Sequence, residues 1–280
     1  MKIYLIYIIY IICLICTLSL ILLYIYHKYG KQKPFETKPK LFIYWEQGWD
    51  NAPYICKMCL KSWEKYNKNH FDIIKLDAKN VPNYIDMTAI VPNYLQIKKI
   101  AHRSDLLRVN LLNKYNGVWV DATTFCTKPL NSWVHQYNEF FAFYKPSKTK
   151  QMSNWFLFSK KKNYIMTTLT QSLNQYWTNR DSNNNYFIFH DIFNNLYDTD
   201  VKFKNQWDKV HHISAHIPHK LKYKEKHKEH VPDDKKKHIV TIQSPMYKLD
   251  HTDKSSNLMQ NSKNNTFYFL AHHHGLILNI

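Results

Sequence analysis

The stretch from residue 94 to residue 121 constrains the fold of this chain more than any other. Residues 94–115 carry the longest helical pattern, and Asn116 and Gly117 then supply a stop signal for a helix. A short apolar run, residues 118–121, follows at once and ends on Asp121. A helix that leads directly into an apolar strand is typical of an α/β fold, which this stretch therefore predicts.

Two further strands are expected before this helix. The apolar run 41–45 is bounded by Gly48, and the run 71–76 forms a second candidate strand. Pro53 opens a helical pattern that extends to about Tyr66, because proline is tolerated in the first turn of a helix. Strand, helix and strand in this order predict a parallel sheet.

The remaining segments alternate between short apolar runs and helical patterns. Short strands are expected at residues 140–144, 155–158, 239–244 and 267–270. Helices are expected at residues 164–177 and 187–197. The polar stretch 220–237 is expected to be a loop.

An uncharged, apolar run from Ile3 to Tyr26 precedes the α/β region. About 20 apolar residues suffice to cross the hydrocarbon core of a bilayer. A cleaved signal peptide is the alternative, but its apolar core is usually shorter and ends in small residues, whereas this run ends in Tyr24-Ile-Tyr26. We therefore predict one N-terminal transmembrane helix, with an anchor at residues 1–27, a stalk at residues 28–40 and a single domain at residues 41–280.

Basic residues flank the apolar run unequally. Lys2 precedes it, whereas the segment that follows carries Lys28, Lys31, Lys33, Lys38 and Lys40. Positive residues stay on the cytoplasmic side of a membrane, so the domain is expected to face the cytoplasm. A lumenal domain, as in the eukaryotic secretory pathway, is the alternative.

The formal net charge of +18 by itself suggests a nucleic-acid partner. However, Lys, Asn, Ile and Tyr are in excess through most of the chain, which indicates a codon bias rather than a binding surface. The one dense basic run, residues 220–238, is interpreted as a solvated loop, near anionic lipid at most. No nucleic-acid partner is expected.

Cys56, Cys59 and Cys126 are the cysteines outside the apolar run, and an odd number does not make a disulfide framework. Cys56 and Cys59 have the spacing of a redox or zinc pair, but no second pair accompanies them. We interpret both as helix residues, with Cys59 on the buried face. The lack of a disulfide framework fits a reducing compartment.

Four residues of the long helix share one face. Ala101, Ser104, Asp105 and Arg108 are spaced i, i+3, i+4 and i+7, which places an acid and an arginine about one turn apart. An exposed salt bridge is one interpretation, because that is the common fate of such pairs. A ligand site is the other, because Asp121 ends the following strand and ligands of open α/β sheets bind at the carboxyl ends of strands.

An aspartate in that place suits a ligand that carries a diphosphate. Hard cations such as Mg²⁺ and Mn²⁺ bind carboxylate oxygens, bridge phosphates and stabilise a diphosphate leaving group. The planar guanidinium of Arg108 suits a phosphate or a sugar hydroxyl.

The pattern Ala-x-x-Ser-Asp-x-x-Arg at residues 101–108, followed by Tyr-Asn-Gly-Val-Trp-Val-Asp-Ala-Thr at residues 115–123, resembles the capsular polysaccharide synthesis glycosyltransferases. That family is related to glycosyltransferase family 32 and to the sugar-transferring domains of large bacterial toxins. The resemblance covers most of residues 41–250. Its other blocks are residues 44–48 with Pro53, residues 59–63, residues 186–190 and residues 246–249.

This resemblance implies a GT-A fold, which is a Rossmann-like nucleotide-diphospho-sugar transferase fold. It also implies a nucleotide-sugar donor, with a UDP-sugar expected, and transfer with retention of the anomeric configuration. The acceptor is expected to be a glycan, a lipid-linked sugar or a protein. The alternative is a catalytically inactive, membrane-tethered protein that binds a carbohydrate or a polyanion.

The same resemblance assigns the central site residues. Asp105 and Arg108 match positions that contact the ribose and the sugar of the donor, and Ser104 stands beside them on the helix. Asp121 matches the first aspartate of a metal-binding Asp-x-Asp, for Mn²⁺ or Mg²⁺. Thr123 stands where the second aspartate would be, which leaves the metal with fewer ligands. Asp105, Arg108 and Asp121 are the expected catalytic residues.

Other residues are candidates with open alternatives. Trp45 and Gln47 follow the first strand, where related folds hold the nucleotide base, although Trp45 also suits the core. His190 and Asp191 suit acceptor binding or catalysis, although a structural histidine is as good an interpretation. His273 is a candidate C-terminal metal ligand, with a polar tail segment as the alternative. No glycine-rich phosphate loop, nucleophile elbow or zinc quartet is present.

Overall fold

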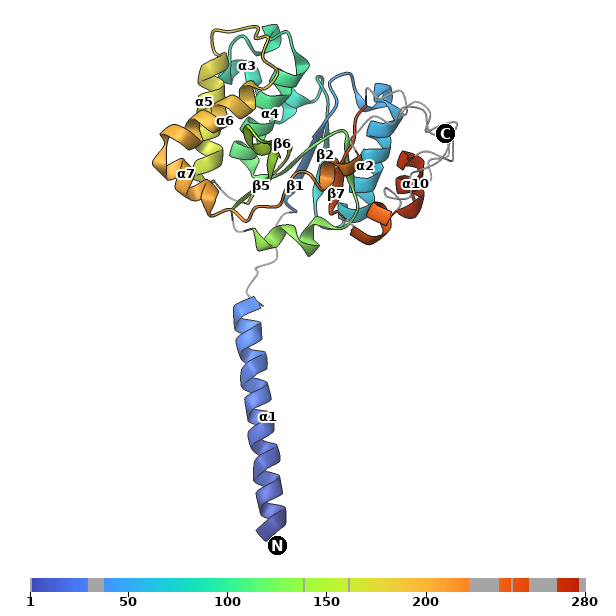
Figure 1. Cartoon of the computed structure of the whole chain (residues 1–280), viewed down its shortest axis with the longest axis vertical. Coiled ribbons are helices and arrows are strands. Elements are labelled where there is room, and N and C mark those ends of the chain that lie inside the picture. Colours follow the sequence, from blue (N-terminus) through green and yellow to red (C-terminus); the bar gives the residue numbers. More distant parts are fainter. Residues whose placement is uncertain are drawn as a thin grey trace. The chain divides into compact units, whose positions relative to one another are not determined.

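The computed structural model of the chain describes residues 2–29, 38–137, 139–160, 162–221, 237–242, 244–251 and 266–276. The chain forms two units, Met1–Lys38 and Pro39–Ile280 (Figure 1).

The first unit contains one helix, α1 (Lys2–Tyr29), whose side chains are described at Tyr4, Tyr7, residues 10–21 and Tyr24. Among the described residues, no helix combines the length and the apolar character that crossing a membrane requires. The predicted anchor is therefore not confirmed. Most of the predicted stalk, residues 30–37, lies outside the described residues.

The second unit is built on a mixed five-stranded sheet with the order β2-β1-β3-β6-β5. The strands β2, β1 and β3 are parallel, whereas β6 is antiparallel to both β3 and β5. The α/β class is confirmed, but the sheet is parallel only in its first half. The strand bounds are β1 (Lys40–Tyr44), β2 (Asp72–Leu76), β3 (Gly117–Asp121), β5 (Phe140–Ser147) and β6 (Lys150–Ser159).

The antiparallel pairing of β5 with β6 has a simple cause. A short turn joins β5 to β6, and a short turn makes only an antiparallel hairpin because a parallel connection needs a crossover of a dozen or more residues. In contrast, β1 and β2 are joined by α2 (Tyr54–Asn67), which provides such a crossover, as predicted.

Helices cover both faces of this sheet (Figure 1). The residues of α2 pack with Ile43 and Val120, whereas Phe42 and Trp119, their neighbours in the strands, pack with helices on the other face. Burial on both faces explains why these strands have continuous apolar sequences rather than alternating ones. The helices of the second face are α4 (Ile100–Tyr115), α5 (Tyr164–Trp177), α6 (Ile188–Thr199) and α7 (Val201–Asp208).

A second, two-stranded sheet pairs β4 (Thr124–Cys126) with β7 (Met246–Lys248) in antiparallel register. The indole Nε1 of Trp63, on α2, donates to the carbonyl of Thr124 at 2.7 Å. Because β4 follows β3 after a tight turn, the pairing of β4 with β7 brings β7 to the carboxyl end of β3.

Short helical segments complete the described part of the chain. They are η1 (Trp49–Asn51), η2 (Val81–Asn83), α3 (Met87–Ile90), η3 (Tyr94–Gln96), η4 (Leu130–Ser132), η5 (Val134–Gln136), η6 (Pro218–Leu221), η7 (His238–Ile242) and α10 (Thr266–His273).

Most predicted elements are confirmed, but three predictions differ from the structure. The helix expected over residues 94–115 begins at Ile100, because extended backbone at Lys99 separates it from η3. Residues 239–242 lie in η7 and not in a strand. Residues 267–270 lie in α10, where Phe267, Leu270 and Ala271 are buried at helical spacing. A run of four apolar residues cannot distinguish a strand from a helix by its period.

The three cysteines of the second unit, Cys56, Cys59 and Cys126, are buried and carry free thiols. Both Cys56 and Cys59 lie on α2, as predicted, and burial raises the pKa of each thiol. They are therefore core residues rather than reactive ones. Of the predicted loop 220–237, residues 222–236 lie outside the described residues.

Replacing Gly117 with alanine is expected to destabilise the fold by about 3 kcal/mol or more. Gly117 starts β3 with a φ of +95°, and a Cβ there would collide with the backbone carbonyl of Lys40 in β1. Gly48→Ala is the matched control, because Gly48 has a φ of +87° but its Cβ would meet no atom closer than 3.9 Å. Urea unfolding should show a loss of about 1 kcal/mol for the control, and equal losses in both variants would contradict the collision.

Candidate functional site

The carboxyl ends of β1 and β3 form the place where a ligand site is expected. From β1 the chain passes to β2 on one side, and β3 then pairs on the other side of β1, so the strand order reverses there. Ligands of open α/β sheets bind at such a switch point. Tyr44 at the end of β1 pairs with Asp121 at the end of β3, and Trp45 follows directly.

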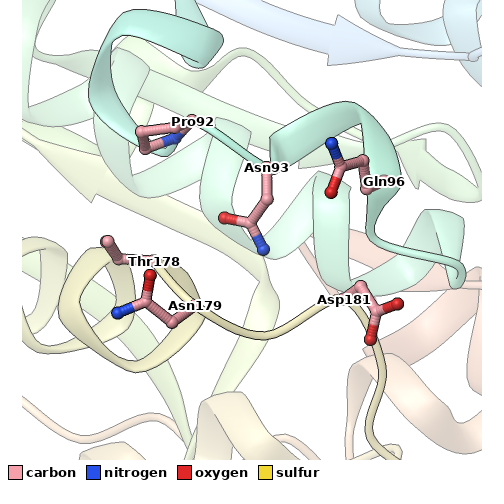
Figure 2. A pocket seen from close by; sticks show the side chains of 6 residues that line it. All are labelled: Pro92, Asn93, Gln96, Thr178, Asn179 and Asp181. Atoms are coloured by element: carbon pink, nitrogen blue, oxygen red, sulfur yellow. The ribbon is translucent and has the colours of Figure 1, made fainter.

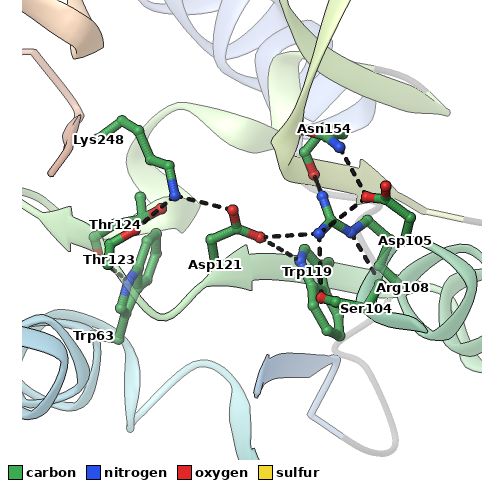
Figure 3. Close-up of polar contacts among 10 residues, drawn as sticks. All are labelled: Trp63, Ser104, Asp105, Arg108, Trp119, Asp121, Thr123, Thr124, Asn154 and Lys248. Atoms are coloured by element: carbon green, nitrogen blue, oxygen red, sulfur yellow. Dashed lines mark hydrogen bonds and ion pairs between the residues drawn. The ribbon is translucent and has the colours of Figure 1, made fainter. Parts of the chain in front are cut away.

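Arg108 lies at the centre of the polar network at this edge (Figure 3). Its Nε donates to the carbonyl of Ser104 at 3.2 Å, and its Nη1 donates to the carbonyl of Asn154, in β6, at 2.6 Å. Its Nη2 donates to Ser104 Oγ at 3.2 Å. The same Nη2 lies 3.2 Å from Asp105 Oδ1 and 3.4 Å from Asp121 Oδ1, so one guanidinium joins both carboxylates.

The guanidinium is enclosed rather than open to solvent. The side chain of Arg108 is 5% exposed and lies between two rings, 5.3 Å from the centroid of Trp119 and 5.9 Å from that of Phe189. The exposed salt bridge considered from the sequence is therefore wrong. Arg108 holds Asp105 and Asp121 in position, and its predicted contact with a donor stays a prediction.

Asp105 is the more deeply buried of the two carboxylates. It accepts a hydrogen bond from Asn154 Nδ2 at 2.9 Å as well as the ion pair with Arg108. Burial, together with the negative charge of Asp121, raises the pKa of Asp105 to about 7, although Arg108 and Asn154 act in the opposite direction. Asp105 is therefore partly protonated near neutral pH and able to donate a hydrogen bond.

Asp121 is 25% exposed and is engaged at both oxygens. Oδ1 accepts from Trp119 Nε1 at 3.1 Å and faces Arg108, whereas Oδ2 accepts from Lys248 Nζ at 2.9 Å. Burial alone would raise the pKa of Asp121, but the charges of Lys248 and Arg108 outweigh it and lower that pKa. Asp121 is therefore a carboxylate throughout the physiological pH range.

Lys248 reaches Asp121 from a distant part of the sequence. In the register of β4 and β7, Thr124 pairs with Lys248, and the backbone N–H of Leu249 donates to the carbonyl of Thr123 at 2.8 Å. The ammonium of Lys248 donates to Thr123 Oγ1 at 2.6 Å as well as to Asp121. Asp121 and Thr123, which were predicted to share a metal ion, therefore lie close together and both accept from Lys248.

The residues present do not fit the predicted site for a divalent cation. Both oxygens of Asp121 and the hydroxyl of Thr123 are already bonded to protein groups, and Lys248 places a positive charge between them. Within the part of the chain that the structure describes, no three His, Cys, Asp or Glu side chains are grouped so that they hold a metal ion. The predicted dependence on Mn²⁺ or Mg²⁺ is not confirmed.

His273, the third predicted metal ligand, lies on α10. The ring of its neighbour His274 approaches Tyr66 on α2, whose hydroxyl is 2.9 Å from His274 Nδ1. Lys65 donates to the carbonyl of His274. These contacts anchor α10 to the end of α2. In the described structure His273 is exposed and stacks on Phe269, so it is not brought to Asp121.

Trp45 and Gln47, which follow β1, differ in burial. Trp45 is half-buried against the core, and its ring meets that of His251 edge-on at 5.3 Å. Gln47 is exposed, and its carbonyl accepts from Asn51. Burial lowers the pKa of His251, and the charge of Lys248 acts in the same direction, whereas Asp250 and Asp121 oppose it.

His190 and Asp191 have different surroundings. His190 is buried, and burial together with the charges of Lys150 and Arg108 lowers its pKa to about 3, so it is neutral at physiological pH. Its Nδ1 is buried without a hydrogen-bond partner among the described residues. Asp191 is exposed and accepts from Asn185. The structure therefore places His190 beside Arg108 and leaves Asp191 at the surface.

Tyr186 adds an exposed ring to this edge. The residue is 60% exposed, but desolvation of its hydroxyl and the negative charges of Asp121 and Asp105 raise its pKa. Its ring meets that of Phe187 edge-on at 5.2 Å. Tyr186 and Phe187 thus form an exposed aromatic pair.

Two surface pockets lie apart from the predicted site residues. One, of about 330 Å³, is polar and lies between the segments 92–96 and 178–181 (Figure 2). The other, of about 370 Å³, includes Tyr137, Asn163 and His211 in its lining. None of the predicted site residues lines either pocket.

Sequence reasoning missed Lys248, Asn154 and His251. Lys248 falls in the block 246–249 that the family resemblance already included, which was the one available signal. Asn154 contributes through its position in β6, and His251 through the chain path after β7, and neither has a recognisable motif.

Comparison with known proteins assigns this chain to a family. A family model described as "Capsular polysaccharide synthesis protein" matches residues 22–269, which confirms the resemblance found in the sequence. A curated relative, the O-glycosyltransferase PaGT of Phomopsis amygdali, is 22% identical over 144 residues, which are 45% of this chain and 36% of the relative. The chain thus spans about a third of that relative's length.

A solved structure, the PaToxG glycosyltransferase, is 16% identical, with a TM-score of 0.43 over 60% of this chain and 73% of that one.

The raised pKa of Asp105 predicts a pH-dependent stability. Below pH 4 the carboxyl is protonated in folded and unfolded chains alike, and its contribution to stability is fully present. As the pH rises through about 7 that contribution is lost, because the folded chain must then ionise a buried group. Relative to Asp105→Asn, the wild type should lose up to about 4 kcal/mol between pH 4 and pH 8 in urea unfolding. A difference that stays constant with pH would refute the raised pKa, and Asp72→Asn at the surface is the control.

Proposed function

Because this chain belongs to the capsular polysaccharide synthesis protein family, we propose that it is a glycosyltransferase that moves a sugar from a nucleotide-sugar to an acceptor hydroxyl. The observation that carries the proposal is the pair of carboxylates, Asp105 and Asp121, which Arg108 joins at the carboxyl ends of β1 and β3. The proposed fold is GT-A, which the mixed sheet with its parallel half supports.

The donor is proposed to be a UDP-sugar, with its base near Trp45 and its diphosphate near Asp121. Trp45 offers a ring at the end of β1, and His251 meets that ring at its edge. The buried Nε1 of Trp45 has no hydrogen-bond partner among the described residues, which suits a group that binds a ligand. The acceptor is proposed to be a glycan, a lipid-linked sugar or a protein that meets the exposed rings of Tyr186 and Phe187.

The proposed reaction is a substitution at the anomeric carbon. The bond from this carbon to the β-phosphate oxygen breaks, and its electron pair stays on the diphosphate. The acceptor oxygen bonds to the same carbon, with retention of configuration, and the acceptor proton is released. Asp105 is suited to hold a sugar hydroxyl, because its carboxyl is partly protonated near pH 7 and both donates and accepts. Arg108 fixes the position of both carboxylates, which reduces the reorganisation that catalysis requires.

A catalytically inactive binding protein is the second candidate. The observation that favours it is the bonding of Asp121 to Lys248 and of Thr123 to the same ammonium, since these residues match a metal site in the family pattern. Release of a nucleoside diphosphate from a nucleotide-sugar separates the candidates, because only an enzyme breaks that bond.

Asp121→Asn is expected to reduce donor hydrolysis by the full chain about 100-fold or more, because it removes the negative charge that holds Lys248 and Arg108 at the site. The measurement is release of UDP or GDP from a panel of nucleotide-sugars. Asp72→Asn, which removes one surface carboxylate, is the control and should leave the rate unchanged. Near wild-type hydrolysis by a folded Asp121→Asn variant would refute the assignment.

Membrane attachment is a separate proposal that rests on the sequence. The run from Ile3 to Tyr26 carries no charge, and the lysines after it favour a domain on the cytoplasmic side, with a lumenal domain as the alternative.

Deleting residues 1–27 is expected to move the protein from the carbonate-resistant membrane fraction to the soluble fraction, because the apolar run is then lost. Protease treatment of sealed membranes reports the side on which the domain lies, and digestion from the cytoplasmic side is expected. A full-length protein that carbonate extracts completely would contradict the anchor.

A further inference from the structure

The ammonium of Lys248 is mostly buried and makes two hydrogen bonds. Its side chain is 13% exposed, and it donates to Asp121 Oδ2 at 2.9 Å and to Thr123 Oγ1 at 2.6 Å. The backbone is fixed as well, because β7 pairs with β4 and Leu249 N–H donates to the carbonyl of Thr123. The position of this charge is therefore set by the fold and not by a flexible side chain on the surface.

Within the described part of the chain, one N–H of this ammonium has no acceptor. A lysine ammonium has three donors and no acceptor. Two are used on Asp121 and Thr123, and no further acceptor for Lys248 occurs among the described residues. The two oxygens that the ammonium contacts, on Asp121 and Thr123, are the ones predicted to hold a metal ion (Figure 3). An ammonium with a further N–H hydrogen-bonds an anionic oxygen well.

The charges around Lys248 also oppose a divalent cation. Arg108 lies 3.4 Å from the other oxygen of Asp121, so two fixed positive groups already face this single carboxylate. Oδ1 of Asp105 already contacts both Arg108 and Asn154. A metal ion would have to displace Lys248 from Asp121 and then remain beside the displaced ammonium.

We propose that Lys248 takes the place of the divalent cation, so that the chain binds and releases a nucleoside diphosphate without a metal. This inference rests on the proposed function, because it assumes a nucleotide-sugar donor. When the anomeric C–O bond breaks, the electron pair stays on the β-phosphate oxygen and the ammonium of Lys248 meets the new charge. Lys248 keeps its proton throughout and hydrogen-bonds the phosphate oxygen through its third N–H.

The test is calorimetric binding of UDP and of GDP to the full chain, in EDTA and in Mn²⁺. One nucleotide is expected to bind the wild type with the same affinity in both conditions. Lys248→Met should bind it at least 10-fold more weakly, and Lys248→Arg, which keeps the positive charge, should bind more tightly than Lys248→Met. Lys75→Met is the matched control, because Lys75 lies at the surface in a pair with Glu64. The affinity of this variant for the nucleotide should equal that of the wild type.

The outcomes separate the inference from the proposed function. Binding that requires Mn²⁺ in the wild type would overturn the role of Lys248 and leave the nucleotide-sugar donor in place. The role of Lys248 would also be overturned if Lys248→Met bound the nucleotide in EDTA with the same affinity as the wild type. If neither nucleotide binds the wild type in either condition, the proposed donor fails, and the inference fails with it. The wild-type comparison needs no variant, so the test stands even if Lys248→Met does not fold.

Discussion

Burial of the Arg108 guanidinium is the interaction on which the candidate site depends. An arginine keeps its charge inside a protein, so the cost of burying it is offset only when its donors meet carboxylates and carbonyls. Its partners come from three elements: Asp105 on α4, Asp121 at the end of β3 and Asn154 in β6. Once these bonds form, the three elements are fixed relative to one another, and the site exists before a ligand binds.

Lys248 balances the charge of this network. The charges of Lys248 and Arg108 lower the pKa of Asp121 and keep it ionised, whereas burial raises the pKa of Asp105 to about 7. One network thus gives two neighbouring carboxyl groups with different protonation states. This combination suits a site in which one group holds charge in place and the other hydrogen-bonds a neutral hydroxyl.

Elements with strong local signals were predictable from the sequence. The helix α5 and the strands β1, β2 and β3 have the predicted positions within one or two residues. Burial on both faces gives β1 and β3 their continuous apolar runs. The errors lie at a short apolar run and at the start of a long helix. Residues 267–270 form part of α10, and the helix α4 begins at Ile100 because the preceding segment is extended. The antiparallel pairing of β5 with β6 follows from the short turn that joins them.

The sequence by itself determined that Asp105 and Arg108 share a helix face and that Asp121 ends a strand, because helical spacing and strand ends are local properties. Only the tertiary structure decided what these residues meet. Lys248 stands 127 residues from Asp121 in the chain, and the pairing of β7 with β4 brings it there. Such a contact depends on strand register across a long separation, and no local pattern encodes it. The same pairing put a lysine where a metal ion was expected.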